Sequence, residues 1–317
     1  MVSDTVTKNM EYDVIALGET MLALAPPTHG SLRDAPALLV DHAGAESNTC
    51  VGLARLGLRT AWVSRLGLDA AGDRILTALD AERVDTRWVE RDPYRWTGLM
   101  LKEPGAGVKY YRGESPASVM SPAVLTGIPI ADARAVLVSG VTALIGPQPH
   151  ATGVALLTRA RGLRIVDPNL RAGLWGSARR VELVRPFVER ADLLMAGFDE
   201  LAEIVGGGEA GSAEQAGLAG RDEAIARAAA ALGPREVVVR GAASVGVLTE
   251  GMWIELAISR GDAVDPIGAG DAFNAGYIFV RLRGGSVEEA LTAGVACGTA
   301  VTTAVSDTAA FPRRLEH

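Results

Sequence analysis

The 317-residue sequence predicts an α/β fold in which a central, mostly parallel sheet is flanked by helices and a small β-sheet forms a lid. Short apolar runs of strand length alternate with helical patterns along most of the chain, as in parallel sheets with right-handed crossovers. Between Val84 and Met120 the alternation gives way to two extended runs with a glycine turn between them, which indicates a hairpin. Near the carboxyl end, a glycine-rich turn joins an extended run to a helix, and such turns bind anions.

The elements are expected in the following order. The first buried strand runs from Asp13 to Gly18, and the helix that opens at residues 43–48 ends at Gly57. Later strands are expected at 61–67, 135–140, 163–169, 192–197, 236–239 and 245–249. Later helices are expected at 70–81, 149–161, 179–190, 222–232, 271–283 and 286–305. The segments at about 20–43 and 92–120 do not follow this alternation and are assigned to the lid.

Composition narrows the classes of function. The net charge of -7 argues against a nucleic-acid or anionic-membrane surface, because both need clustered Lys and Arg, so a small-molecule partner is expected. Cys50 and Cys297 do not form a Cys-x-x-Cys pair, and the sequence therefore indicates neither a zinc site nor a disulfide framework. Neither a secretory signal nor a run of about 18 apolar residues is visible, which predicts a cytoplasmic protein. Residues 315–317 look like the beginning of an expression tag and are left out of the domain.

The clearest chemistry lies in Asp265–Gly276, which reads DPIGAGDAFNAG. The small residues Gly268, Ala269 and Gly270 let the backbone approach a ligand, and their N–H groups are expected at the positive end of a helix dipole. Asp271 follows directly and can accept a proton from a substrate hydroxyl while the amides stabilise charge on a transferring phosphoryl group. The alternative is an ordinary helix N-terminus at which the carboxylate only interacts with the dipole.

This string resembles the carboxyl-terminal signature of the PfkB, or ribokinase-like, family of carbohydrate kinases. It departs from the signature at Pro266, where the family commonly has Thr. The resemblance extends over about residues 12–305 and implies one ribokinase-like kinase domain that uses ATP and Mg²⁺. It also implies that Asp271 is the catalytic base and that the three preceding amides form the anion hole. A monovalent cation near Asp265 is left open as a further cofactor.

Two further motifs resemble substrate-binding parts of this family. The run AGAESN is similar to the Gly-Gly-Ala-x-x-Asn signature that binds sugar hydroxyls, and it retains Gly44 and Asn48; the alternative is a capped surface helix. The run KYYR in the lid hairpin is similar to a motif of 2-keto-3-deoxygluconate kinases, in which Tyr110 and Arg112 would contact the keto-acid end of the substrate. On its own, this run also fits cross-strand packing, whereas an arginine can hold a carboxylate through a bidentate contact.

Three motifs follow predicted strands at the carboxyl edge of the sheet, where open α/β folds bind ligands. Asp167–Arg171 resembles the family's Asp-x-Asn-x-Arg, in which Arg171 would reach the substrate or the γ-phosphate; an Asp-Pro turn with a solvated arginine is the alternative. Glu200 matches the glutamate of Asn-x-x-Glu, which the family ties to Mg²⁺ through water, although the Asn is replaced here. Arg240 and Gly241 match a nucleotide-side motif whose Lys and second Gly are also replaced.

The sequence thus predicts ATP-dependent phosphorylation of a primary hydroxyl of a sugar or sugar acid, with 2-keto-3-deoxygluconate as the expected substrate. Two alternatives are open: a ribokinase-like or fructokinase-like specificity, and a non-catalytic sugar-binding regulator on the same fold. Under the first alternative Arg112 would not matter for substrate binding, because a neutral sugar has no carboxylate for this arginine to hold. In relatives the lid strands often pair between two subunits, which implies a homodimer.

Overall fold

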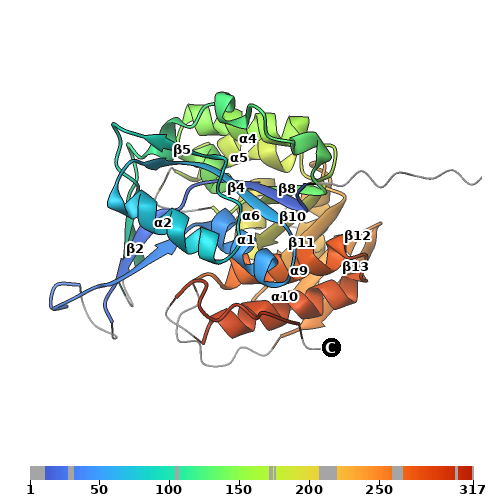
Figure 1. Cartoon of the computed structure of the whole chain (residues 1–317). Coiled ribbons are helices and arrows are strands. Elements are labelled where there is room, and N and C mark those ends of the chain that lie inside the picture. Colours follow the sequence, from blue (N-terminus) through green and yellow to red (C-terminus); the bar gives the residue numbers. More distant parts are fainter. Residues whose placement is uncertain are drawn as a thin grey trace, which may run out of the picture.

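The computed structural model describes residues 11–27, 32–103, 107–170, 174, 176–206, 220–258, 267–303 and 306–315. Within these residues, nine strands form one large sheet (Figure 1). They are β1 (Val14–Leu17), β4 (Thr60–Gly67), β5 (Val89–Asp92), β8 (Ala135–Ser139), β9 (Leu163–Asp167), β10 (Leu193–Gly197), β11 (Glu236–Arg240), β12 (Ser244–Thr249) and β13 (Met252–Ala257). The strand order is β13-β12-β11-β10-β9-β8-β1-β4-β5. Neighbouring strands from β5 to β11 are parallel, and β12 and β13 continue the sheet antiparallel.

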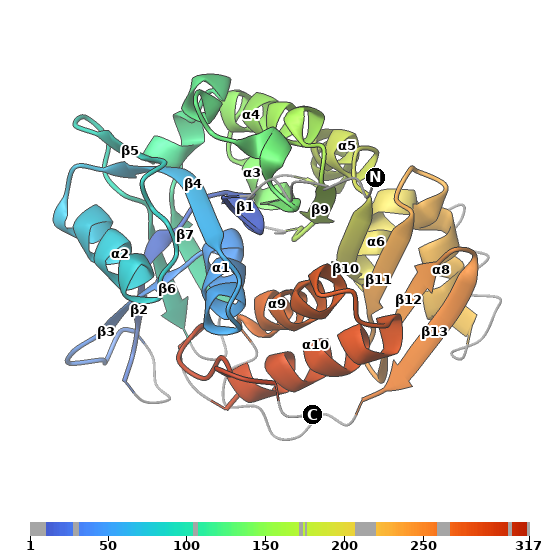
Figure 2. The same cartoon turned by 45° about the vertical axis from the view of Figure 1, so that its right-hand side comes forward.

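Helices cover both faces of this sheet (Figure 2). Their bounds are α1 (Ala45–Arg55), α2 (Ala70–Ala81), α3 (Gly140–Leu144), α4 (Pro147–Arg159), α5 (Ser177–Val188), α6 (Phe198–Val205), α8 (Arg221–Ala230), α9 (Ala269–Leu282) and α10 (Val287–Val301). Buried side chains of α4, α5, α6 and α8 share one hydrophobic cluster, and those of α1, α2, α9 and α10 share a second. In the part of the chain that the structure describes, no helix combines the length and the apolar character that a membrane span requires.

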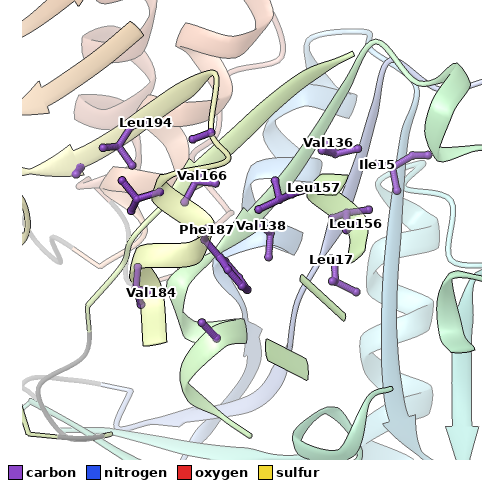
Figure 3. Close-up of a cluster of buried hydrophobic side chains, with 14 of the residues drawn as sticks. Ile15, Leu17, Val136, Val138, Leu156, Leu157, Val166, Val184, Phe187 and Leu194 are labelled. Atoms are coloured by element: carbon purple, nitrogen blue, oxygen red, sulfur yellow. The ribbon is translucent and has the colours of Figure 1, made fainter. Parts of the chain in front are cut away.

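The strands supply both clusters because successive side chains of a strand point to opposite faces. In β1, Ile15 and Leu17 belong to the first cluster, whereas Val14 and Ala16 belong to the second. Figure 3 shows Ile15 and Leu17 in the first cluster with Phe187 of α5. All four β1 side chains are completely buried, so this strand lies at the centre of the domain.

A second sheet of four strands lies beside the carboxyl edge of the large sheet, on the left of Figures 1 and 2. Its strands are β2 (Met21–Ala25), β3 (Leu39–Ala43), β6 (Leu99–Glu103) and β7 (Gly107–Tyr111), in the order β3-β2-β6-β7. Strands β2 and β6 pair parallel, and the outer strands pair antiparallel with them. The expected hairpin is therefore confirmed as β6 and β7, and a small sheet lies beside the large one as the fold class predicted.

The fold class is confirmed, and the helix expected at 70–81 has these bounds in the structure. Strands β2, β5 and β13 and helix α3 were not predicted as separate elements. Strand β5 reads VERD, whose charges reflect its place at the edge of the sheet, and α3 is only five residues long, too short to show a helical period. The extended run expected before the glycine-rich turn lies outside the described residues.

Candidate functional site

A cavity of about 350 Å³ lies between the carboxyl edge of the large sheet and the small sheet. Its lining combines three parts of the fold. The small sheet contributes mainly apolar side chains, the strand ends of the large sheet contribute charged groups, and the start of α9 contributes backbone and a carboxylate. This size suits a small ligand, and the position is where open α/β sheets bind their ligands.

The N-terminus of α9 has the geometry of an anion site. Gly268 caps the helix with φ of +84°, and a Cβ atom there would lie 2.9 Å from the carbonyl oxygen of Asp307, so glycine is required for two reasons. The first intrahelical bond within this turn runs from the N–H of Ala272 to the carbonyl of Gly268. Among the described residues, no hydrogen bond uses the N–H groups of Gly268, Ala269 or Gly270. These donors and the helix dipole together favour a bound anion.

Asp271 stands in the first turn of α9, and its carboxylate is held by α1. Nδ2 of Asn48 donates to Oδ2 of Asp271 at 2.8 Å, and Oγ1 of Thr49 donates to the Asp271 carbonyl at 3.3 Å. Asn48 is 1% exposed, so its orientation is fixed by packing. The structure thus brings together the Asp271 carboxylate and the amides of residues 268–270, as expected from the sequence. It also adds Asn48, from the AGAESN motif, as a hydrogen-bond donor to this carboxylate.

Glu46 is a buried carboxylate beside this cavity that the sequence prediction did not include among the site residues. Its Oε1 accepts hydrogen bonds from the N–H of Ser139 at 2.8 Å and from Oγ1 of Thr142 at 3.2 Å. Complete burial raises its pKa, against the lowering effect of these hydrogen bonds. A Cβ at Gly18 would lie 2.1 Å from the Glu46 carboxylate, so that glycine leaves room for it. The only signal in the sequence was an acidic residue at the start of a helix.

Asp167, Arg240 and Asn274 form a buried network below the start of α9. Nη1 of Arg240 donates to Oδ2 of Asp167 at 3.0 Å and to Oδ1 of Asn274 at 2.8 Å, while Nδ2 of Asn274 donates to Oδ2 of Asp167 at 2.7 Å. Although burial opposes its charge, the carboxylates of Asp167 and Glu200 raise the pKa of Arg240. Arg240 lines the cavity, but Nη1 of its guanidinium already donates to the side chains of Asp167 and Asn274. At Gly241, a Cβ would lie 2.2 Å from the Asp222 carboxylate, which explains the glycine by packing.

Glu200 lies in the first turn of α6 and also lines the cavity. Its oxygens accept the N–H groups of Leu170 and Gly197, each at 2.7 Å. Burial raises the pKa of Glu200, and the negative charge of Asp167 raises it further. Among the described residues, no group of three His, Cys, Asp or Glu side chains could hold a metal ion. Both Glu200 oxygens already accept backbone N–H groups, which leaves fewer lone pairs for direct ligation and suits a contact with Mg²⁺ through water.

The small sheet places Tyr110 and Arg112 on the cavity. The Arg112 guanidinium lies 5.5 Å from the ring centre of Tyr110, and its Nε donates to Oε2 of Glu19 at 2.6 Å. Gly44 caps α1 on the same side, and a Cβ there would lie 2.5 Å from the Glu19 carbonyl oxygen. Arg171, expected to reach the substrate or the γ-phosphate, lies outside the described residues.

Comparison with known proteins agrees with this architecture. Residues 12–314 match the family described as pfkB family carbohydrate kinase. The chain is 30% identical over 316 residues to 2-dehydro-3-deoxygluconokinase of Bacillus subtilis (strain 168), covering 96% of this chain and 94% of that protein. Its structure matches a PfkB protein from Polaromonas sp. JS666 with a TM-score of 0.81 and 31% identity, covering 94% and 98% of the two chains. An E. coli protein in complex with ATP and Mg²⁺ has the same fold, with a TM-score of 0.83 and 20% identity over 95% and 96% of the two chains.

Proposed function

The chain belongs to the pfkB family of carbohydrate kinases, and from this premise we propose that it transfers the γ-phosphoryl group of ATP to a primary hydroxyl of 2-keto-3-deoxygluconate, also called 2-dehydro-3-deoxygluconate. The observation that carries the proposal is a single cavity that Asp271 and the start of α9 share with Tyr110 and Arg112. A phosphoryl-transfer end and a carboxylate-binding end would thus face one small molecule.

In this proposal Asp271 accepts the proton of the attacking hydroxyl, and Asn48 holds the carboxylate in place through their 2.8 Å hydrogen bond. The N–H groups of Gly268, Ala269 and Gly270 stabilise the charge on the transferring phosphoryl group. Mg²⁺, when bound, neutralises phosphate charge, and Glu200 would contact it through water. Arg171 is proposed to help neutralise the same charge.

At the other end of the cavity, Arg112 is proposed to bind the substrate carboxylate beside Tyr110. An arginine is suited to this contact because its planar N–H groups match the two oxygens of a carboxylate. Gly44 and Asn48 are proposed to contact the sugar hydroxyls. Arg240 and Gly241 are proposed to contribute to the nucleotide side, Arg240 through the network that it forms with Asp167 and Asn274.

A kinase for a neutral sugar is the second candidate, and one observation favours it. Glu19 already offsets the charge of Arg112 inside the cavity, so the free site presents little net positive charge at this end. ADP release coupled to a reporter, measured with 2-keto-3-deoxygluconate, fructose, ribose and adenosine, separates the candidates. Turnover confined to the keto acid supports the proposal, whereas turnover on fructose or ribose alone rules out the sugar acid.

We also propose that the protein acts as a homodimer through the small sheet. Its outer strands carry large apolar side chains that are unusually exposed, with 48% for Leu39, 42% for Val40 and 60% for Tyr111. Light scattering at micromolar concentration tests this assignment, and a monomeric mass would contradict it.

A further inference from the structure

Glu19 and Arg112 form a buried ion pair at the cavity, and the proposed mechanism leaves Glu19 without a role. Glu19 lies in the short connection from β1 to β2, where the chain passes from the large sheet to the small one, and Arg112 directly follows β7. Both side chains line the cavity, and the residues are 4% and 7% exposed. The pair therefore joins a strand end of the large sheet to a strand end of the small sheet.

The Glu19 carboxylate occupies one edge of the Arg112 guanidinium. Nε donates to Oε2 at 2.6 Å, and Nη2 pairs with the same oxygen. The other carboxylate oxygen accepts a hydrogen bond from Oγ of Ser115. Nη1 of Arg112 has no hydrogen-bond partner within the ranges that the structure describes. The terminal edge formed by Nη1 and Nη2 is thus left for a second carboxylate, because a guanidinium has two edges that can each bind one.

Two glycines make room for Glu19 in this position. A Cβ at Gly98 would lie 2.9 Å from Oε1 of Glu19, and a Cβ at Gly44 would lie 2.5 Å from its carbonyl oxygen. Larger residues at either place would displace the side chain or its backbone. The placement of Glu19 is therefore built into the packing around it and does not depend on the ion pair alone.

We propose that Glu19 is a positioning residue that sets how strongly the cavity prefers an acid to a neutral sugar. It holds the guanidinium so that the terminal edge meets the substrate carboxylate, and its charge limits the attraction of Arg112 for anions. This inference rests on the proposed function, in which Arg112 binds the carboxylate. A free arginine would rotate among several conformers, and ordering it would weaken binding.

Glu19→Gln separates the charge from the hydrogen bonds. The amide oxygen can still accept from Arg112 while the amide nitrogen donates to Oγ of Ser115, so the arginine stays oriented and only the negative charge is lost. The ratio of kcat/KM for 2-keto-3-deoxygluconate to kcat/KM for fructose is expected to rise about tenfold, as for one unit charge removed near a partly screened site. Glu19→Ala, which also frees the arginine, is expected to raise KM for the acid with a much smaller change in kcat.

Glu203→Gln is the matched control. Glu203 forms a similar two-point pair with Arg180, at 3.1 and 2.8 Å, but does not line the cavity. It reports what the loss of a partly buried charge pair does to the fold alone, and its substrate ratio should equal that of the wild type. Ser115→Ala is a second test that keeps both charges: it loosens the Glu19 carboxylate and should raise KM for the acid about fivefold.

The outcomes separate this inference from the proposed function. A wild-type enzyme that phosphorylates fructose but not the keto acid would refute both. A wild-type enzyme that prefers the keto acid, together with an unchanged substrate ratio in a folded Glu19→Gln variant, would refute the role of Glu19 alone. If Glu19→Gln does not fold, an unchanged KM for the acid in Ser115→Ala overturns the inference, and the expected rise in KM supports it.

Discussion

Replacing Asn48 by alanine is expected to lower kcat about 10- to 100-fold without unfolding the protein. Nδ2 of Asn48 lies 2.8 Å from Oδ2 of Asp271 and orients the proposed base. A hydrogen bond to a charged group contributes about 1.5–3 kcal/mol, and about 1.4 kcal/mol corresponds to a factor of ten in rate. Steady-state ADP release with the keto acid measures the change, and circular dichroism shows whether the fold is intact.

Asn48→Asp sharpens the same prediction. Two carboxylates at this separation cannot both ionise readily, so the pKa at which the pair releases its last proton rises. Because the base acts in its ionised form, the acid limb of kcat against pH should move up by about one unit or more. Thr49→Val is the control, since Thr49 contacts the Asp271 carbonyl and not its carboxylate. A wild-type kcat and pH profile in both Asn48 variants would refute the positioning of Asp271 by Asn48.

Two further predictions concern the start of α9 and the buried carboxylate of α1. Gly268→Ala should lower kcat at least about tenfold, because φ of +84° and the 2.9 Å approach to Asp307 force the turn to shift; a wild-type kcat would contradict the anion-hole assignment. Burial raises the pKa of Glu46 above its usual 4.5, so the folded state binds the carboxyl proton more tightly than the unfolded state does. The contribution of Glu46 to the free energy of unfolding of the wild type therefore falls as pH rises above 4.5. The free energy of unfolding of Glu46→Gln, measured by urea titration relative to the wild type, should therefore increase with pH from about 4.5; a difference independent of pH would count against a raised pKa.

The sequence predicted the parallel sheet well because its inner strands are apolar on both faces. β1 and β8 are short buried runs, and the helices between strands have clear periods. Strand β13 was missed because none of its side chains is fully buried, since it lies at the far edge of the sheet. Its hairpin turn uses Glu250 and Gly251, both with positive φ, and a Glu-Gly pair is a weaker turn signal than Asn-Gly.

In the site, motifs predicted the residues that stand next to each other in the sequence but not their distant partners. The turn at Gly268 and the carboxylate of Asp271 are local features, so the sequence contained them. The contact of Asn48 with Asp271 spans 223 residues, and the contact of Glu19 with Arg112 spans 93. Which acid meets which arginine depends on how the two sheets pack, and a single sequence does not record it.

ADP release by the wild type and by Asp271→Asn, with 2-keto-3-deoxygluconate and ATP, tests the central claim most directly. Asparagine has nearly the same shape as aspartate but cannot accept the proton in the same way. We predict turnover by the wild type, nearly complete loss of turnover by the variant, and sugar-acid binding by the variant that is still detectable by calorimetry. Turnover by Asp271→Asn at the wild-type rate would contradict the assignment of Asp271 as the catalytic base.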